Sequence, residues 1–180
     1  MLAAMLAVTV SMLSAVAGGH PAPAPVTPPG TTIASLPLQT CADVSTATIS
    51  GFYGYVYGAP CTGSPTQTFR FTPLTAGPAG TYQVKNASTG QCLIQYALGV
   101  KQQACTGSVP ADSTSTEWTL TKVGTTGYDY RFAVTTSIAT SSPTCLQIFP
   151  RPRSHPGPVL MLQACDSTQP AQVLTLTSAP

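Results

Sequence analysis

Charged side chains are scarce in this sequence of 180 residues. It contains seven Lys or Arg and five Asp or Glu, which is 7% of the chain and gives a formal net charge of +2. Ordinary soluble domains carry roughly 25% charged residues. This small excess of positive charge gives no basic patch for nucleic acid, and the sequence has no acidic tail. No nucleic-acid partner is therefore expected. Surface polarity must come mainly from Thr, Ser and Gln, a composition common in secreted proteins.

Residues that usually build metal and catalytic sites are also few. The only histidines are His20 and His155, and no Cys-x-x-Cys pair occurs. A zinc site is therefore not expected, and neither is a cofactor. The sequence has no paired-carboxylate design, no Gly-x-Ser-x-Gly motif and no phosphate-binding glycine loop. We therefore expect a binding protein and not an enzyme.

Long helices are disfavoured beyond the N-terminal segment, because 18 Pro and 15 Gly interrupt helical hydrogen bonding. Residues 1–17, MLAAMLAVTVSMLSAVA, are almost continuously apolar and end in small residues, which predicts a cleaved secretory signal peptide. The alternative is a retained anchor, since the apolar run is at the short limit for a bilayer span and no basic residue precedes it. After cleavage we expect no membrane span and a secreted, extracellular protein.

A Pro- and Gly-rich segment follows the predicted signal. Residues 18–35, GGHPAPAPVTPPGTTIAS, carry no apolar period, which predicts a flexible, extended linker. The folded part is then expected to begin near Leu36 and to occupy residues 36–180.

Six cysteines follow the predicted signal, and an even number in an export context favours disulfides. They come as three spaced pairs: Cys41 and Cys61, Cys92 and Cys105, Cys145 and Cys165. Bonds within each pair would close short loops and would each stabilise the fold by about 3 kcal/mol. Other pairings stay open, because six cysteines allow about 15 connectivities.

Each cysteine pair lies within the same succession of predicted strands. Alternating segments with β-branched and aromatic residues follow the pairs at 68–74, 117–123 and 173–179. This recurrence divides the chain into three units, at about residues 36–80, 81–127 and 128–180. One unit is too small to bury its own apolar face, but three units around a pseudo-threefold axis form a closed barrel with hairpin caps. The predicted fold class is all-β.

The two ends of each unit also repeat. The starts are Cys41-Ala42-Asp43-Val44, Cys92-Leu93-Ile94-Gln95 and Cys145-Leu146-Gln147-Ile148. The ends are Gln67-Thr68-Phe69, Thr116-Glu117-Trp118 and Gln172-Val173-Leu174. This pattern resembles the ricin B-type lectin family, with its Cys-x-Asp starts and Gln-x-Trp ends, over about residues 36–180. The resemblance implies a single β-trefoil, with the last residue of each end in the core.

The resemblance also implies a sugar site. In sugar-binding members of the family, an Asp two residues after the first Cys accepts hydrogen bonds from sugar hydroxyls, and an aromatic ring packs on the sugar. Only the first unit keeps this acid, at Asp43, whereas the others have Ile94 and Gln147. The resemblance therefore implies at most one intact site. The predicted sugar-binding residues are Asp43, Tyr55, Tyr57 and Gln67.

Simpler structural roles are open for the same residues. The family's usual ring position is Ala59 here, so a tyrosine between residues 53 and 57 has to substitute for it. Asp43 is alternatively the acid of an Asx turn. Tyr53, Tyr55 and Tyr57 share one face of a strand, where they either bind a ligand or cover the barrel.

The expected function is weak glycan binding, made useful by several copies. The alternative is a protein-binding adaptor or structural subunit of a secreted toxin or surface complex, which the loss of two sugar sites favours. A third hypothesis is that the protein is a protease inhibitor that presents the basic loop RPRSHPGP, residues 151–158. Asn86-Ala87-Ser88 matches an N-glycosylation sequon, which matters only in a eukaryotic secretory route.

Overall fold

The structure is a computed structural model, and the residues that it describes form twelve β-strands and two short 3-10 turns. It describes residues 30–44, 54–75, 80–96, 99–105, 116–123, 129–134, 144–149 and 159–178. These residues include no α-helix, and nothing helical among them is long and apolar enough to cross a membrane. The predicted signal peptide, Tyr53 and the basic loop 151–158 lie outside the described residues.

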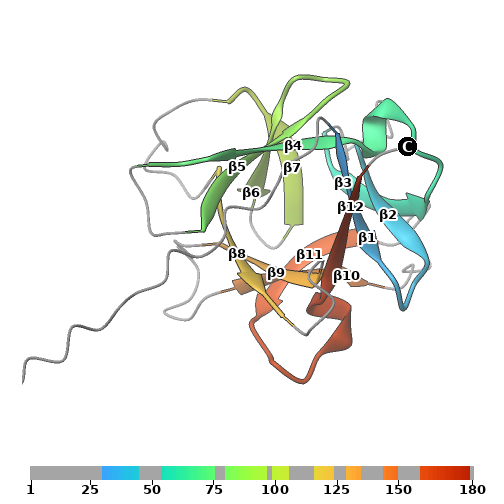
Figure 1. Ribbon diagram of the computed structural model, residues 1–180, viewed down its shortest axis with the longest axis vertical. Helices are drawn as coiled ribbons and strands as arrows, with labels where there is room; N and C mark the ends of the chain where they lie inside the picture. The colour runs from blue at the N-terminus through green and yellow to red at the C-terminus, as the bar shows by residue number, and fades with distance from the viewer. Residues whose placement is uncertain are drawn as a thin grey trace, which may run out of the picture.

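The strands fall into three successive groups of four, one group for each unit (Figure 1). The first unit contains β1 (Thr31–Ser35), β2 (Thr40–Val44), β3 (Val56–Pro60) and β4 (Phe69–Pro73). The second contains β5 (Thr81–Asn86), β6 (Cys92–Tyr96), β7 (Gly99–Gln103) and β8 (Glu117–Lys122). The third contains β9 (Asp129–Val134), β10 (Thr144–Phe149), β11 (Val159–Ala164) and β12 (Leu174–Ser178).

The outer strands of the three units close into a barrel. Antiparallel pairing runs in a ring from β1 to β12, β9, β8, β5 and β4, and returns to β1. Ring closure leaves no unpaired barrel edge, which protects the sheet from pairing with other chains. The units therefore stabilise one another, because no unit forms the barrel alone.

The inner strands of each unit form a hairpin, and the three hairpins meet in a triangular cap. The register pairs at the three junctions are Tyr57 with Val159, Met161 with Gly99, and Lys101 with Tyr55. Each pair joins the residue four before the second cysteine of one unit to the residue six before it in another unit. The same contact is thus made three times around a pseudo-threefold axis, as the repeats predict.

The last residues of the three unit ends fill the barrel. Phe69 and Leu174 have no exposed surface, and Trp118 exposes 1%. The indole Nε1 of Trp118 donates a hydrogen bond of 3.0 Å to the carbonyl oxygen of Leu93, which satisfies its only polar group. The prediction that these residues form the core is confirmed.

Each cysteine pair forms a disulfide within its own unit. The bonds are Cys41–Cys61, Cys92–Cys105 and Cys145–Cys165, with sequence separations of 20, 13 and 20 residues. Each bond connects the start of a hairpin to the segment that leaves it. The predicted pairing is confirmed, and the other connectivities are excluded.

The predicted start of the fold is wrong by five residues. Residues 31–35, which the composition predicts to be linker, form β1, and all five are buried. β1 pairs with β12, β2 and β4, so it closes the barrel. The composition of residues 18–35 is dominated by prolines and glycines, so it predicts a linker. The strand at its end, TTIAS, contains neither residue type.

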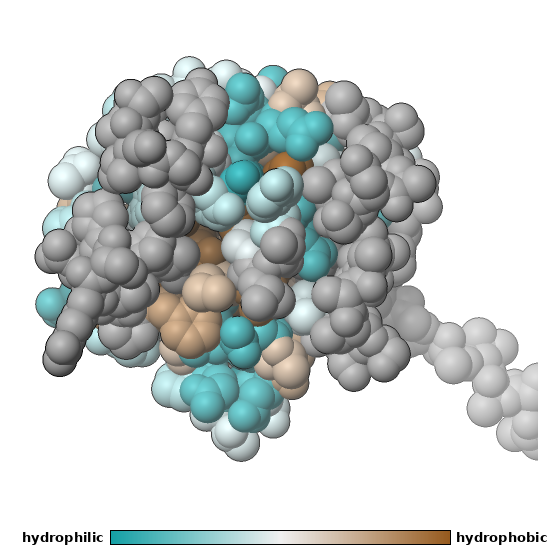
Figure 2. Space-filling model, turned by 180° about the vertical axis from the view of Figure 1, so that it is seen from behind, coloured by the Kyte–Doolittle hydropathy of each residue, from teal (hydrophilic) through white to brown (hydrophobic). Residues whose placement is uncertain are grey.

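The described surface is polar but carries few charges. Only two large hydrophobic residues among those described are exposed, Leu36 at 64% and Tyr96 at 45%. Figure 2 shows the coloured atoms of one face mostly in the hydrophilic and neutral range, with small hydrophobic areas between them.

Candidate functional site

The hairpin of the first unit places Asp43 opposite Tyr57. In β2, Ala42 and Val44 are fully buried and face the core, so Asp43 lies on the opposite side of the strand. Asp43 and Tyr57 are register partners in the pair β2–β3, so their side chains leave the same face. Two of the predicted site residues are therefore neighbours.

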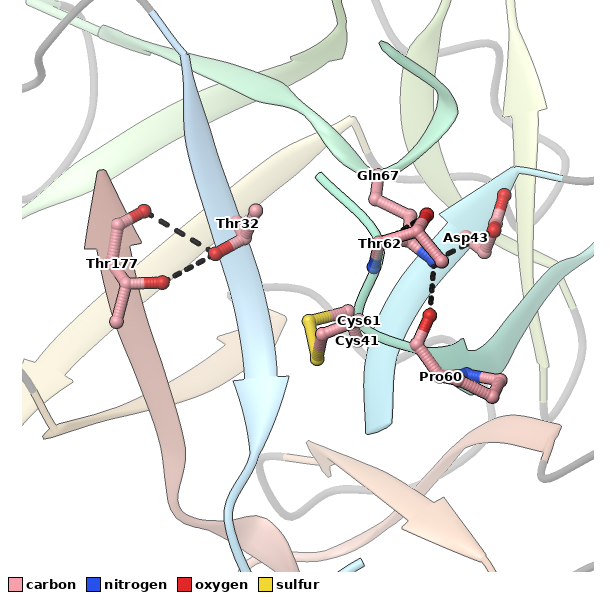
Figure 3. The surroundings of a disulfide bond; sticks show 8 residues. All are labelled: Thr32, Cys41, Asp43, Pro60, Cys61, Thr62, Gln67 and Thr177. Carbon is pink, nitrogen blue, oxygen red and sulfur yellow. Dashed lines mark hydrogen bonds between the residues drawn. A yellow bond between two sulfur atoms is a disulfide. The ribbon is translucent and has the colours of Figure 1, made fainter. Parts of the chain in front are cut away.

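The buried side chain of Gln67 bonds the carboxylate of Asp43. It ends the 3-10 turn Pro65–Gln67, and its side chain is 1% exposed. Its Nε2 donates hydrogen bonds to Oδ2 of Asp43 at 2.9 Å and to the carbonyl oxygen of Pro60 at 2.8 Å (Figure 3). Its Oε1 accepts a bond of 2.8 Å from the backbone N–H of Thr62. Both N–H groups and the oxygen of the amide are thus used within the protein, and one of the N–H groups bonds the carboxylate of Asp43.

The two oxygens of the Asp43 carboxylate differ in their contacts. Its side chain is partly exposed, and its Oδ1 has no hydrogen-bond partner among the described residues. The bond from Gln67 spans 24 residues of sequence. The residues that follow Val44, whose backbone N–H groups an Asx turn at Asp43 would use, lie outside the described residues. A fixed carboxylate with one free oxygen is a strong acceptor for a hydroxyl donor.

The two described tyrosines have different surroundings. Tyr57 exposes only 7% of its surface, and burial, followed by the proximity of Tyr55, raises its pKa above 10.0. Tyr55 is partly exposed, and its ring contacts the ammonium of Lys101, whose Nζ lies 4.3 Å from the ring centroid. Of the four predicted residues, Asp43, Tyr57 and Gln67 lie together, whereas the ring of Tyr55 contacts the second unit.

The third unit repeats the arrangement without the acid. Gln172 is 1% exposed, and its Nε2 donates to the carbonyl oxygen of Ala164 at 2.9 Å and to Oε1 of Gln147 at 3.3 Å. Its Oε1 accepts a bond of 2.9 Å from the backbone N–H of Asp166. Gln147 therefore occupies the place of Asp43, but its neutral amide offers no charge-assisted acceptor.

The second unit has lost the arrangement altogether. Ile94 occupies the position of the acid and is 2% exposed, and Thr116 replaces the anchoring glutamine. Lys101 lies opposite Ile94 in the register of β6 and β7. Lys101 also lies between two aromatic rings, since its Nζ is 3.7 Å from the centroid of Tyr96 as well as close to Tyr55.

This lysine was not predicted as a functional residue. The signal was available, because Lys101, Tyr57 and Met161 each precede the second cysteine of their unit by four residues. Comparing the three units at this position identifies a lysine in the second unit where the first has a tyrosine and the third has a methionine.

The sequon asparagine is part of the framework. Asn86 has no exposed surface, and its Nδ2 donates to the carbonyl oxygens of Thr66 and Thr68 at 2.9 and 3.1 Å. Its Oδ1 accepts bonds from the backbone N–H groups of Ser88 and Thr89. The side chain connects the 3-10 turn that carries Gln67 to β5, and it is inaccessible to modification in the folded state.

The described residues contain no group of three His, Cys, Asp or Glu side chains arranged to hold a metal ion. What they bring together is an acceptor carboxylate beside a tyrosine in one hairpin, and an ammonium between tyrosines at the next junction of the cap.

Comparison with known proteins agrees with the architecture. The family described as ricin-type beta-trefoil lectin domain-like matches residues 65–148. No curated protein sequence matches the chain. The resemblance to the ricin B-type lectin family is therefore confirmed by the match over residues 65–148.

Solved structures match over most of the chain. The designed threefold symmetric protein ThreeFoil is 20% identical with a TM-score of 0.59, covering 84% of this chain and 99% of its own. The Macrolepiota procera ricin B-like lectin in complex with lactose is 18% identical with a TM-score of 0.52, covering 82% and 94%. The Haemophilus ducreyi cytolethal distending toxin is 17% identical with a TM-score of 0.59, covering 84% of both chains. At these identities the similarity shows the β-trefoil fold, as predicted.

Proposed function

We propose that this protein is an exported carbohydrate-binding β-trefoil with one sugar site, at Asp43. The observation that carries the proposal is the carboxylate of Asp43, which the buried Gln67 holds through Oδ2 while Oδ1 has no partner among the described residues. A sugar presents neighbouring hydroxyl donors, and a fixed carboxylate is well suited to accept from them.

The residues around the carboxylate have separate roles in this proposal. Gln67 orients Asp43 and contacts no ligand, because its amide is fully used within the protein. Tyr57 forms the floor of the site beside the acid, since it lies directly opposite in the register and is almost completely buried. Tyr55 flanks the site toward the second unit. The binding is reversible recognition, and no chemical step is proposed.

The affinity of such a site is modest. A hydrogen bond to a charged group contributes about 1.5–3 kcal/mol. One site per chain then gives weak binding, which multivalent display on a surface or in a complex would strengthen. The three disulfides support an oxidising, extracellular location, because such bonds persist there and are rare in the cytosol.

The test is a glycan array probed with the full chain and with Asp43→Asn. The substituted amide still accepts the hydrogen bond from Gln67 but presents a neutral group to the ligand, as Gln147 does in the third unit. We expect binding to a defined neutral glycan, weakened roughly tenfold to hundredfold by the substitution.

The matched control is Asp166→Asn. Asp166 is an exposed acid in the third unit whose carboxylate accepts bonds from Thr168, and those bonds lower its pKa. This variant makes the same change in net charge away from the site and should bind like the parent. Absence of binding by the folded parent chain, or equal binding by both variants, would contradict the proposal.

A second candidate function is that of a protein-binding subunit in a secreted complex. Two of the three units lack the acceptor carboxylate, and a cytolethal distending toxin shares the fold over 84% of both chains. This candidate predicts a stoichiometric protein partner that co-purifies from culture fluid and stays bound to Asp43→Asn. Glycan binding that depends on Asp43 would favour the first function.

A further inference from the structure

Lys101, Tyr55 and Tyr96 form a cluster at the junction of the first and second units. The Nζ of Lys101 lies 4.3 Å from the ring centroid of Tyr55 and 3.7 Å from that of Tyr96. Both distances are well within the range of a cation–π contact. The two rings therefore hold an ammonium group at one place on the cap.

The backbone brings Tyr55 and Lys101 together. Tyr55 and Lys101 form a β-bridge, and the N–H of Gln102 donates a bond of 2.7 Å to the carbonyl oxygen of Gly54. Gly99 leaves room for the ring, because a Cβ at that position would lie 3.2 Å from Cε1 of Tyr55. The other two junctions of the cap pair Tyr57 with Val159 and Gly99 with Met161, so no cation stands at the equivalent positions.

The charge of Lys101 is not neutralised within the described structure. No carboxylate of a described residue lies within ion-pair distance of it, and within the described part of the chain its ammonium contacts the two rings. Tyr96 is 45% exposed, so the cluster is open to solvent on that side. An ammonium whose N–H groups have no acceptor among the described residues, beside an exposed aromatic face, is complementary to an anionic group carried on a partly apolar ring.

We propose that this cluster is a second ligand site, which binds the carboxylate of an acidic saccharide such as a uronic or sialic acid. Lys101 donates to the carboxylate, and Tyr96 packs against the C–H face of the sugar ring. The choice of a saccharide rests on the proposed function, whereas the carboxylate follows from the unneutralised lysine. The second unit thus has Lys101 at the position of Tyr57 and Ile94 at the position of Asp43.

The two sites are built on different hairpins of the cap. Asp43 lies opposite Tyr57 in the hairpin of the first unit, whereas Lys101 lies in β7 of the second unit and is bridged to Tyr55.

The test is an NMR titration of the full chain with matched monosaccharides that differ only at the acidic group. The probes are galacturonate against galactose and glucuronate against glucose, with N-acetylneuraminate as a third acid and sodium acetate as a simple anion. We expect saturable shifts of the Tyr55 and Tyr96 ring signals with the acids, and at least about tenfold weaker binding of the neutral partners.

The variants separate this site from the first one. Lys101→Met should abolish the response to the acids, whereas Lys101→Arg should retain it because the guanidinium keeps the charge. Lys122→Met, at an exposed lysine in β8, removes the same charge elsewhere and should respond like the parent. Asp43→Asn should also respond to the acids like the parent. The test at Lys101 therefore gives a clear result whether or not a neutral sugar binds at Asp43.

Three outcomes would overturn the inference. The first is an absence of saturable shifts with all three acids. The second is an equal response to acetate, which would reduce the cluster to a simple anion contact. The third is an unchanged response in Lys101→Met, which would place the acid elsewhere on the protein.

Discussion

Replacing Gln67 by glutamate tests the contact that holds the proposed site together. The amide Nε2 of Gln67 donates to Asp43 at 2.9 Å and to the carbonyl oxygen of Pro60 at 2.8 Å. In Gln67→Glu an oxygen takes the place of that nitrogen and meets two acceptors, one of which is charged. Two like charges about 4 Å apart cost roughly 4 kcal/mol at an effective dielectric constant near 20.

Protonation limits this cost. An ordinary glutamate has a pKa of about 4.3, and each unit of pKa corresponds to about 1.36 kcal/mol, so taking up a proton at pH 7 costs about 3.7 kcal/mol. Asp43 is partly exposed, and solvent screens its charge. We therefore expect Gln67→Glu to reduce the free energy of unfolding at pH 7 by about 2–4 kcal/mol.

The pH dependence has a definite sign. The introduced carboxyl has a higher pKa in the folded state than in the unfolded state, because the neighbouring carboxylate favours its protonated form. Between those two pKa values the folded state binds more protons, so stability falls as the pH rises. The deficit of the variant should be smallest near pH 4, should grow toward neutral pH, and should level off above the folded-state pKa.

The third unit supplies the control. Gln172→Glu removes the same hydrogen-bond donor, but its partner is Gln147, whose amide can rotate to present an N–H. We expect a loss of about 1–2 kcal/mol and a weaker pH dependence. Urea unfolding at pH 4 and pH 7, followed by the fluorescence of the single tryptophan, measures both variants. Equal losses with the same pH profile would refute the described contact between Gln67 and Asp43.

Three further predictions concern the framework. Asn86→Ala should lower the free energy of unfolding by about 2–4 kcal/mol, because its buried amide satisfies four partners; an unchanged urea midpoint would contradict this. Replacing Cys92 and Cys105 by serine should cost about 3 kcal/mol and lower the melting temperature measured by calorimetry, whereas an unchanged temperature would argue against the bond. The raised pKa of Tyr57 means that its contribution to stability is present below pH 10 and is lost as the pH rises further, so an alkaline absorbance titration of Tyr57→Phe should lack a late-titrating component of the parent.

The fold could be predicted from a few recurring residues. The three cysteine pairs and the residues Phe69, Trp118 and Leu174 recur at matching places because the barrel repeats the same contacts three times. The strand 31–35 was missed, because its five residues follow a proline-rich segment and its partners lie far away in the sequence. A short strand gains its stability from those partners and not from its own propensity.

The candidate site was only partly predictable. The repeat position identified Asp43 and Gln67 as candidates, but the burial of Gln67 and its hydrogen bond to Asp43 depend on how the 3-10 turn packs against the hairpin. The contact of Tyr55 with Lys101 joins hairpins of different units, so no pattern within one unit contains it.

We propose that the carboxylate of Asp43, held by Gln67, accepts hydrogen bonds from a neutral sugar. The most direct measurement is a titration of the isotope-labelled full chain with the best neutral glycan from the array, beside Asp43→Asn. We expect saturable amide shifts centred on β2 and β3, with an affinity roughly tenfold to hundredfold lower in the variant. Shifts centred on another part of the trefoil, or the same affinity in both proteins, would contradict it.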